Sequence, residues 1–157
     1  MNLIIKNMDE DLARKILTWK YEPPYDFYNN EVNEEGMREF LAGTYRAITD
    51  DEGEVFGFLC TGKSAQIPVG NNYGVYKDNF VDIGLGMHPD YTGKGYGYDF
   101  MTFILKYIKE NYTGVPMRLS VATFNKRAIH LYEQIGFVKQ DKFKTDVADF
   151  ITMVKRN

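Results

Sequence analysis

Three glycines at alternate positions, Gly93, Gly95 and Gly97, lie where the pattern of the chain changes from strand to helix. Residues 80–88 before them are typical of a strand, and the residues after them place apolar side chains at the spacing of an amphipathic helix. A glycine turn of this kind exposes backbone N–H groups at a helix N-terminus, where an anion is stabilised. The turn therefore predicts an α/β fold with an anion site, although on its own it is equally explained as a simple connection between two elements.

The remaining apolar pattern predicts a mixed sheet covered by helices. Strands are expected at residues 3–6, 45–49, 55–61, 80–88, 117–123, 137–143 and 150–154. Helices are expected after the caps Asn7 or Asp9, Asn33 and Asn125, and after Gly97. An aromatic loop at 21–30 and a polar surface loop at 62–79 interrupt the pattern. This order of strands and helices gives an α/β (α+β) mixed sheet flanked by helices.

Composition narrows the class of protein further. A length of 157 residues fits one domain, 1–157. The net charge of −3 argues against a general electrostatic grip on nucleic acid or on an anionic membrane. One cysteine, Cys60, and two histidines are too few for a zinc cluster, so we expect no metal. No run of 18 apolar residues is present, and a soluble cytoplasmic protein is the expectation.

Two segments carry a resemblance to a known family. Residues 87–97, Met-His-Pro-Asp-Tyr-Thr-Gly-Lys-Gly-Tyr-Gly, match neither the Walker A loop nor the Rossmann turn. The second segment has the pattern Asn-x-x-Ala-x-x-Leu-Tyr-x-x-x-Gly-Phe and comprises Asn125, Ala128, Leu131, Tyr132, Gly136 and Phe137. Together they resemble the GNAT superfamily, the Gcn5-related N-acetyltransferases, whose acetyl-CoA loop reads Arg/Gln-x-x-Gly-x-Gly/Ala. Gly95 and Gly97 match that loop, whereas Thr92 stands where Arg or Gln is usual.

This resemblance implies the GNAT acyl-CoA N-acyltransferase fold, a central twisted mixed sheet with a splayed strand pair, and acetyl-CoA (coenzyme A) as the cofactor. Backbone groups of Gly86 and Met87 would hold the pantetheine arm, and N–H groups of the glycine turn would hold the diphosphate. The residues expected to bind the cofactor are Gly86, Met87, Thr92, Gly93, Lys94, Gly95, Tyr96, Gly97, Tyr98, Asn125 and Ala128. Gly86 is also explained by a twist or bulge, and Asn125 by helix capping alone.

The resemblance also implies direct acetyl transfer from acetyl-CoA to a primary amine in a ternary complex. Tyr132 matches the general acid of the family, and a phenol of ordinary pKa about 10 can protonate a leaving thiolate at neutral pH. A tyrosine at helical spacing is also typical of core packing. Asp82, on the strand before the glycine turn, could relay a proton from the amine through water, or could simply be a hydrogen-bonded strand residue.

By the same resemblance, residues 21–30 and 62–79 would bind the acceptor, a small-molecule amine or a peptide amine. Tyr25, Asp26 and Tyr28 could line a pocket in which the carboxylate attracts an ammonium, or they could belong to an aromatic lid packed on the core. Two alternative functions are a noncatalytic acyl-CoA-binding module and an acetyltransferase acting on protein amino termini. Tyr132 favours catalysis, and the crowded aromatic loop favours a small acceptor. A homodimer is compatible with the resemblance.

Overall fold

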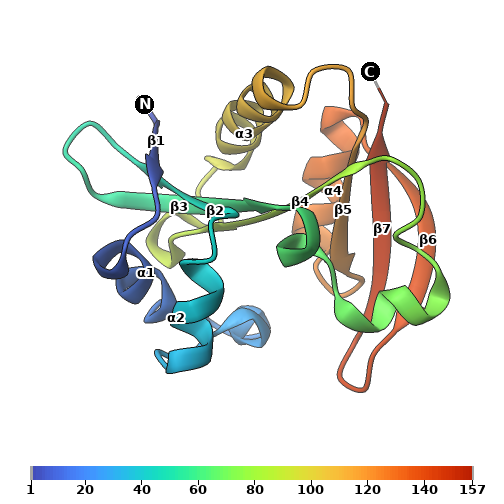
Figure 1. Cartoon of the computed structure of the whole chain (residues 1–157), viewed down its shortest axis with the longest axis horizontal. Coiled ribbons are helices and arrows are strands. Elements are labelled where there is room, and N and C mark those ends of the chain that lie inside the picture. The colour runs from blue at the N-terminus through green and yellow to red at the C-terminus, as the bar shows by residue number, and fades with distance from the viewer. Residues whose placement is uncertain (1, 157) are drawn as a thin grey trace. The chain divides into compact units, whose positions relative to one another are not determined.

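Seven strands form a mixed sheet in the order β1-β2-β3-β4-β5-β7-β6 in the computed structural model, which describes residues 2–156 (Figure 1). The strands are β1 (Ile4–Asn7), β2 (Tyr45–Thr49), β3 (Val55–Thr61), β4 (Val81–Met87), β5 (Met117–Ala122), β6 (Val138–Lys144) and β7 (Asp149–Lys155). The helices are α1 (Glu10–Leu17), α2 (Glu34–Phe40), α3 (Gly97–Asn111) and α4 (Lys126–Ile135). The expected mixed sheet flanked by helices is confirmed. None of the described helices is long and apolar enough to cross a membrane.

The chain divides into two compact units. The first contains the described residues up to Cys60 together with Leu85–Tyr96, and the second contains Thr61–Gly84 and the chain from Gly97 onward. β4 therefore begins in the second unit and ends in the first, and the glycine turn returns the chain to the second unit at Gly97.

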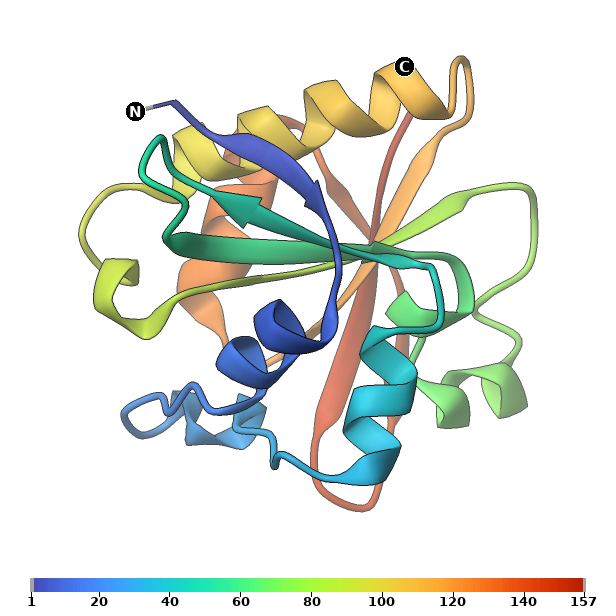
Figure 2. The ribbon, with the colours of Figure 1, turned by 60° about the vertical axis from the view of Figure 1, so that its left-hand side comes forward.

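The first unit is built on the antiparallel strands β1, β2 and β3. Helices α1 and α2 lie on the same side of these strands, as Figures 1 and 2 both show. Each helix begins at a side-chain cap, because Asp9 accepts a hydrogen bond from the N–H of Leu12 and Asn33 accepts one from Gly36. The ring of Phe58 on β3 lies 5.6–6.2 Å from three other rings of this unit, those of Trp19, Phe40 and Tyr45. The same ring lies against Gly86, near the end of β4.

The second unit contains the short parallel ladder between β4 and β5. Only Val81↔Met117 and Asp82↔Arg118 are paired in this ladder, although β4 continues to Met87. This early end of the ladder is the expected splayed strand pair. By contrast, β5 pairs with β7 over its full length, from Met117↔Lys155 to Ala122↔Phe150. Helices α3 and α4 contact each other and bury apolar side chains, including Phe100, Ile104, Ile108 and Ile129.

The segment 62–80 differs from the simple surface loop that its polar composition predicts. It forms two short 3-10 helices, η2 (Gly62–Ala65) and η3 (Pro68–Tyr73), and lies along β6 (Figure 1). Val75 is buried in one cluster with Ala122, Phe143 and Phe150. Apolar side chains such as Val75 anchor this segment, and the average polarity of its 19 residues hides them.

Candidate active site

The glycine turn keeps open space beside its backbone. It follows the short 3-10 helix η4 (Pro89–Tyr91), and Gly93 and Gly95 have φ of +71° and +87°, in the left-handed region that favours glycine. A Cβ placed on Gly95 would have no heavy atom within 4 Å. Lys94 between them is exposed. Gly93, Lys94 and Gly95 are all exposed, so the turn leaves room for a ligand beside its backbone.

Aromatic rings fix this turn at both ends. The ring of Tyr91 stacks on that of buried Phe56, with centroids 4.5 Å apart, and the ring of Tyr96 meets both of them edge-on at 5.8 Å. The hydroxyl of Thr92 donates to the Pro89 carbonyl over 2.9 Å. Thr92 therefore stabilises the turn itself, and the turn is shaped by the protein's own contacts.

Gly97 differs from Gly95 because its surroundings are crowded. It begins α3, and a Cβ there would lie 3.1 Å from Cδ2 of Leu131 on α4. The missing side chain lets the two helices approach closely, while the next residue, Tyr98, is 58% exposed. A side chain at Gly97 would therefore crowd Leu131, which favours glycine at this second position of the family motif.

Helix α4 carries the remaining residues of the second motif. The Asn125 side chain caps this helix by accepting a hydrogen bond from the Ala128 N–H over 3.2 Å. One turn further, the Tyr132 side chain is only 8% exposed, and its ring lies 6.1 Å from that of Phe137. The capping expected for Asn125 is thus present, and Tyr132 is buried beside Phe137.

At the end of β4, the two residues expected to face the pantetheine arm have contacts of their own in the first unit. A Cβ on Gly86 would lie 2.3 Å from Cε1 of Phe58, so this ring accounts for the glycine. The Met87 carbonyl accepts a hydrogen bond from the Tyr21 hydroxyl over 2.7 Å. Burial raises the pKa of Tyr21 to about 12, so the hydroxyl stays protonated and acts as the donor at neutral pH.

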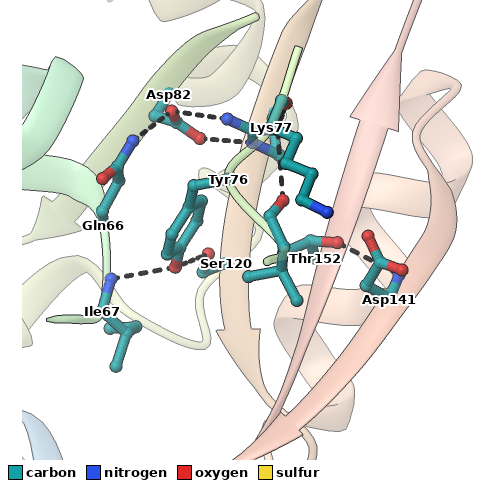
Figure 3. Close-up of polar contacts among 10 residues, drawn as sticks. Gln66, Ile67, Tyr76, Lys77, Asp82, Ser120, Asp141 and Thr152 are labelled. Carbon is teal, nitrogen blue, oxygen red and sulfur yellow. Dashed lines mark hydrogen bonds and ion pairs between the residues drawn. The ribbon is translucent and has the colours of Figure 1, made fainter. Parts of the chain in front are cut away.

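Asp82 lies in a buried ion pair (Figure 3). Its side chain is nearly inaccessible, and its Oδ1 and Oδ2 accept hydrogen bonds from Nε and Nη2 of Arg118 over 2.6 and 2.9 Å. Oδ2 also accepts one from Nε2 of Gln66 over 2.9 Å. Three donors therefore occupy the carboxylate, which makes this the geometry of a structural ion pair.

Arg118 joins β4 and β5 to the segment 62–80. Its Nη1 donates to the carbonyls of Val75 and Lys77 over 3.2 and 2.6 Å. Its guanidinium lies over the rings of Tyr76 and Phe80, 5.2 and 5.0 Å from their centroids.

Tyr76 continues this network (Figure 3). Its hydroxyl accepts a hydrogen bond from the Ile67 N–H over 2.9 Å and bonds the Ser120 hydroxyl over 2.7 Å. Burial raises the pKa of Tyr76 above its ordinary value. Sequence reasoning missed Arg118, although a lone arginine in the apolar strand Met117–Ala122 is itself a signal of a buried partner.

The three residues expected to bind the acceptor lie on the 3-10 helix η1 (Tyr25–Tyr28). Tyr25 and Tyr28 are half-buried, Asp26 is exposed, and none of the residues of η1 is fully buried. The surrounding segment 21–39 holds six exposed carboxylates and a single basic residue, Arg38. The carboxylates belong to Glu22, Asp26, Glu31, Glu34, Glu35 and Glu39. This part of the first unit therefore presents a strongly acidic surface.

Comparisons with known proteins agree on one fold. Two solved acetyltransferases illustrate the likeness, and both cover nearly the whole chain. The GNAT-family acetyltransferase from Bacillus anthracis is 16% identical with a TM-score of 0.71, covering 98% of this chain and 94% of its own. The aminoglycoside-bound enzyme AAC(6')-Ib, with ribostamycin and coenzyme A, is 15% identical with a TM-score of 0.76, covering 100% and 94%.

A third solved structure is a spermidine N-acetyltransferase chimera from Vibrio cholerae and hSSAT. It is 19% identical with a TM-score of 0.69, and the match covers 98% of this chain and 95% of the other. A comparison with curated protein sequences gives no match. The model of the Acetyltransferase (GNAT) family matches residues 9–137, which is most of the chain. The protein therefore belongs to the GNAT family and is an acetyl-CoA-dependent N-acetyltransferase.

Proposed function

We propose that residues 1–157 act as a single cytoplasmic acetyltransferase domain that moves the acetyl group of acetyl-CoA directly to a primary amine. The acceptor is a small molecule with more than one positive charge. The observation that carries the proposal is the open backbone of the glycine turn at Gly95, directly before α3. Acetyl-CoA supplies the activated thioester when it is bound. The residues of this chain bind the cofactor, orient the amine and protonate the leaving thiolate.

The cofactor is assigned to the residues expected from the sequence. N–H groups of the turn, from Gly93 to Tyr98, would hold the diphosphate, with Thr92 stabilising the turn and Lys94 adding a positive charge. Backbone groups of Gly86 and Met87 would contact the pantetheine arm, and Asn125 and Ala128 would contribute from the start of α4. This assignment is supported by the free space at Gly95 and by the early end of the β4–β5 ladder.

Tyr132 is the proposed general acid. It lies buried on α4, and a neutral phenol can donate its proton to a leaving thiolate. For Asp82 we propose a positioning role in place of proton relay, because three hydrogen-bond donors already occupy its carboxylate. A carboxylate held in this way keeps Arg118 and the segment 62–80 in place.

A polycationic acceptor is supported by the acidic surface of residues 21–39. Six exposed carboxylates within 19 residues attract cations over longer distances than a single contact does. Asp26 would pair with an ammonium, and the rings of Tyr25 and Tyr28 would contact the apolar part of the acceptor. Two of the structural neighbours are named for spermidine and for an aminoglycoside complex, and both of those ligands are polyamines.

Cofactor binding is tested by thermal unfolding with and without acetyl-CoA. The wild-type protein should unfold at a higher temperature with acetyl-CoA, because a ligand that binds only the folded state stabilises it. Gly95→Glu should abolish this shift, since it places a carboxylate in the open space. Gly53→Glu is the matched control, because Gly53 also has a positive φ, +83°, and open surroundings, at the β2–β3 turn. A wild-type protein that shows no shift at millimolar acetyl-CoA refutes the proposal.

Acetyl transfer is tested by an acetyl-CoA turnover screen against polyamines, aminoglycosides, amino acids and peptide amino termini. Polyamines or aminoglycosides should be the best acceptors. With the best of these, Tyr132→Phe should lower kcat far more than it weakens acetyl-CoA binding. Tyr112→Phe is the control, because Tyr112 is 37% exposed and follows α3, outside the proposed cofactor and acceptor segments. An unchanged kcat in Tyr132→Phe removes this residue from the mechanism, and a preference for peptides favours the alternative acceptor class.

A further inference from the structure

We infer that Tyr21 is a positioning residue that links the acceptor segment, residues 21–30, to the end of β4. The inference rests on the proposed function for the places of the two ligands. The Tyr21 hydroxyl donates a hydrogen bond to the carbonyl of Met87 over 2.7 Å, across 66 residues of sequence. A single side chain thus connects the segment proposed for the amine with the backbone proposed for the pantetheine arm.

Tyr21 also closes the acceptor segment at its base. Its backbone N–H donates to Oδ1 of Asn29 over 2.7 Å, and the neighbouring Lys20 donates from Nζ to the carbonyl of Asn30 over 3.0 Å. The two ends of the segment are therefore held together at the residue whose hydroxyl reaches β4. A displacement of β4 at Met87 is transmitted to both ends of the segment.

Contacts from Trp19 hold the residues on either side of Met87. The ring of Trp19 lies 5.0 Å from that of His88, in an edge-on arrangement, and 6.2 Å from that of Phe58. The Phe58 ring in turn lies against Gly86. Side chains of the first unit thus contact three successive residues, Gly86 to His88. Among these contacts, Tyr21 provides the hydrogen bond, to Met87. This continuity distinguishes it from an isolated surface hydrogen bond.

Occupation of one site should then affect the other. A ligand that fixes the Met87 carbonyl also fixes the hydrogen bond from Tyr21, and so reduces the opening of residues 21–30. Such coupling is reciprocal, because a cofactor that orders the acceptor segment must bind more tightly when the acceptor has already ordered it. One neutral hydrogen bond corresponds to a coupling of about two- to tenfold.

The test is amide hydrogen exchange on the full chain, with coenzyme A as the probe. In the wild-type protein, coenzyme A should slow exchange in the glycine turn, residues 92–97, and about two- to tenfold in residues 21–30. Tyr21→Phe should keep the protection of the turn and lose that of residues 21–30. Tyr112→Phe, outside both proposed sites, should behave as the wild type. A purely structural role for Tyr21 would change exchange equally with and without coenzyme A.

The outcomes separate the inference from the function on which it rests. If coenzyme A does not slow amide exchange in residues 92–97 of the wild type, the proposed cofactor site is refuted, and the inference with it. Protection of the turn without protection of residues 21–30, or equal protection of that segment in Tyr21→Phe, overturns the inference alone. Asn29→Ala provides a second variant that keeps the hydroxyl of Tyr21. It should reduce the protection of residues 21–30 by opening the base of the segment, and full protection there contradicts the inference.

Discussion

The buried ion pair between Asp82 and Arg118 allows a quantitative test by Arg118→Met. Methionine keeps much of the apolar volume but leaves a carboxylate that is 4% exposed without its cation. The carbonyls of Val75 and Lys77 also lose a donor. Removal of one partner from a buried pair costs about 3–5 kcal/mol. In a chain of this size, that corresponds to a fall in Tm of roughly 6–20 °C.

The assay is urea unfolding, in which the midpoint should fall while the slope stays constant. Adding Asp82→Asn to Arg118→Met removes the stranded charge and should recover about 2 kcal/mol or more. Arg38→Met is the matched control, because its ion pair with Glu34 spans 3.2 Å but has side chains 72% and 90% exposed. That control should cost about 0.5 kcal/mol or less. A loss below about 1 kcal/mol in Arg118→Met, or no recovery in the double variant, refutes the reasoning.

Three further predictions concern packing and pH. Gly86→Ala should destabilise the protein by about 1–3 kcal/mol in urea unfolding, because the new methyl group overlaps the Phe58 ring, and adding Phe58→Leu should restore part of the loss. Gly97→Val should push α3 from Leu131 and lower Tm, whereas an unchanged Tm contradicts the packing explanation. Burial raises the pKa of Tyr21 from 10.0 to about 12, so its contribution to stability is full below pH 10 and is lost as the pH rises toward 12. Tyr21→Phe should therefore show a smaller fall in unfolding free energy across that window, and an equal fall in both proteins argues against it.

The secondary structure of this chain was predictable because its signals are local. Asp9, Asn33 and Asn125 each cap the helix that follows them, and Gly136 ends α4 in the left-handed conformation. Strands β2 and β3 begin and end at the expected residues. Side-chain periodicity and capping depend on neighbours within a few residues, so the sequence carries them directly.

The contacts that shape the candidate site were not predictable in this way. Gly86 is glycine because of a ring on β3, and Tyr21 reaches a carbonyl 66 residues away. The partners of Arg118 come from β4 and from a segment whose average composition is polar. Spacing along the chain cannot identify a partner that only the folded sheet brings close, and the role of Asp82 depended on such a partner.

The acidic surface of residues 21–39 also affects how the two substrates reach the enzyme. A polycationic acceptor approaching six exposed carboxylates is drawn in by their field, so its association rate should fall as added salt screens them. Acetyl-CoA is an anion and is repelled by the same field, so salt should speed its encounter. If the acceptor is polycationic, as proposed, the two Michaelis constants should therefore shift in opposite directions with ionic strength.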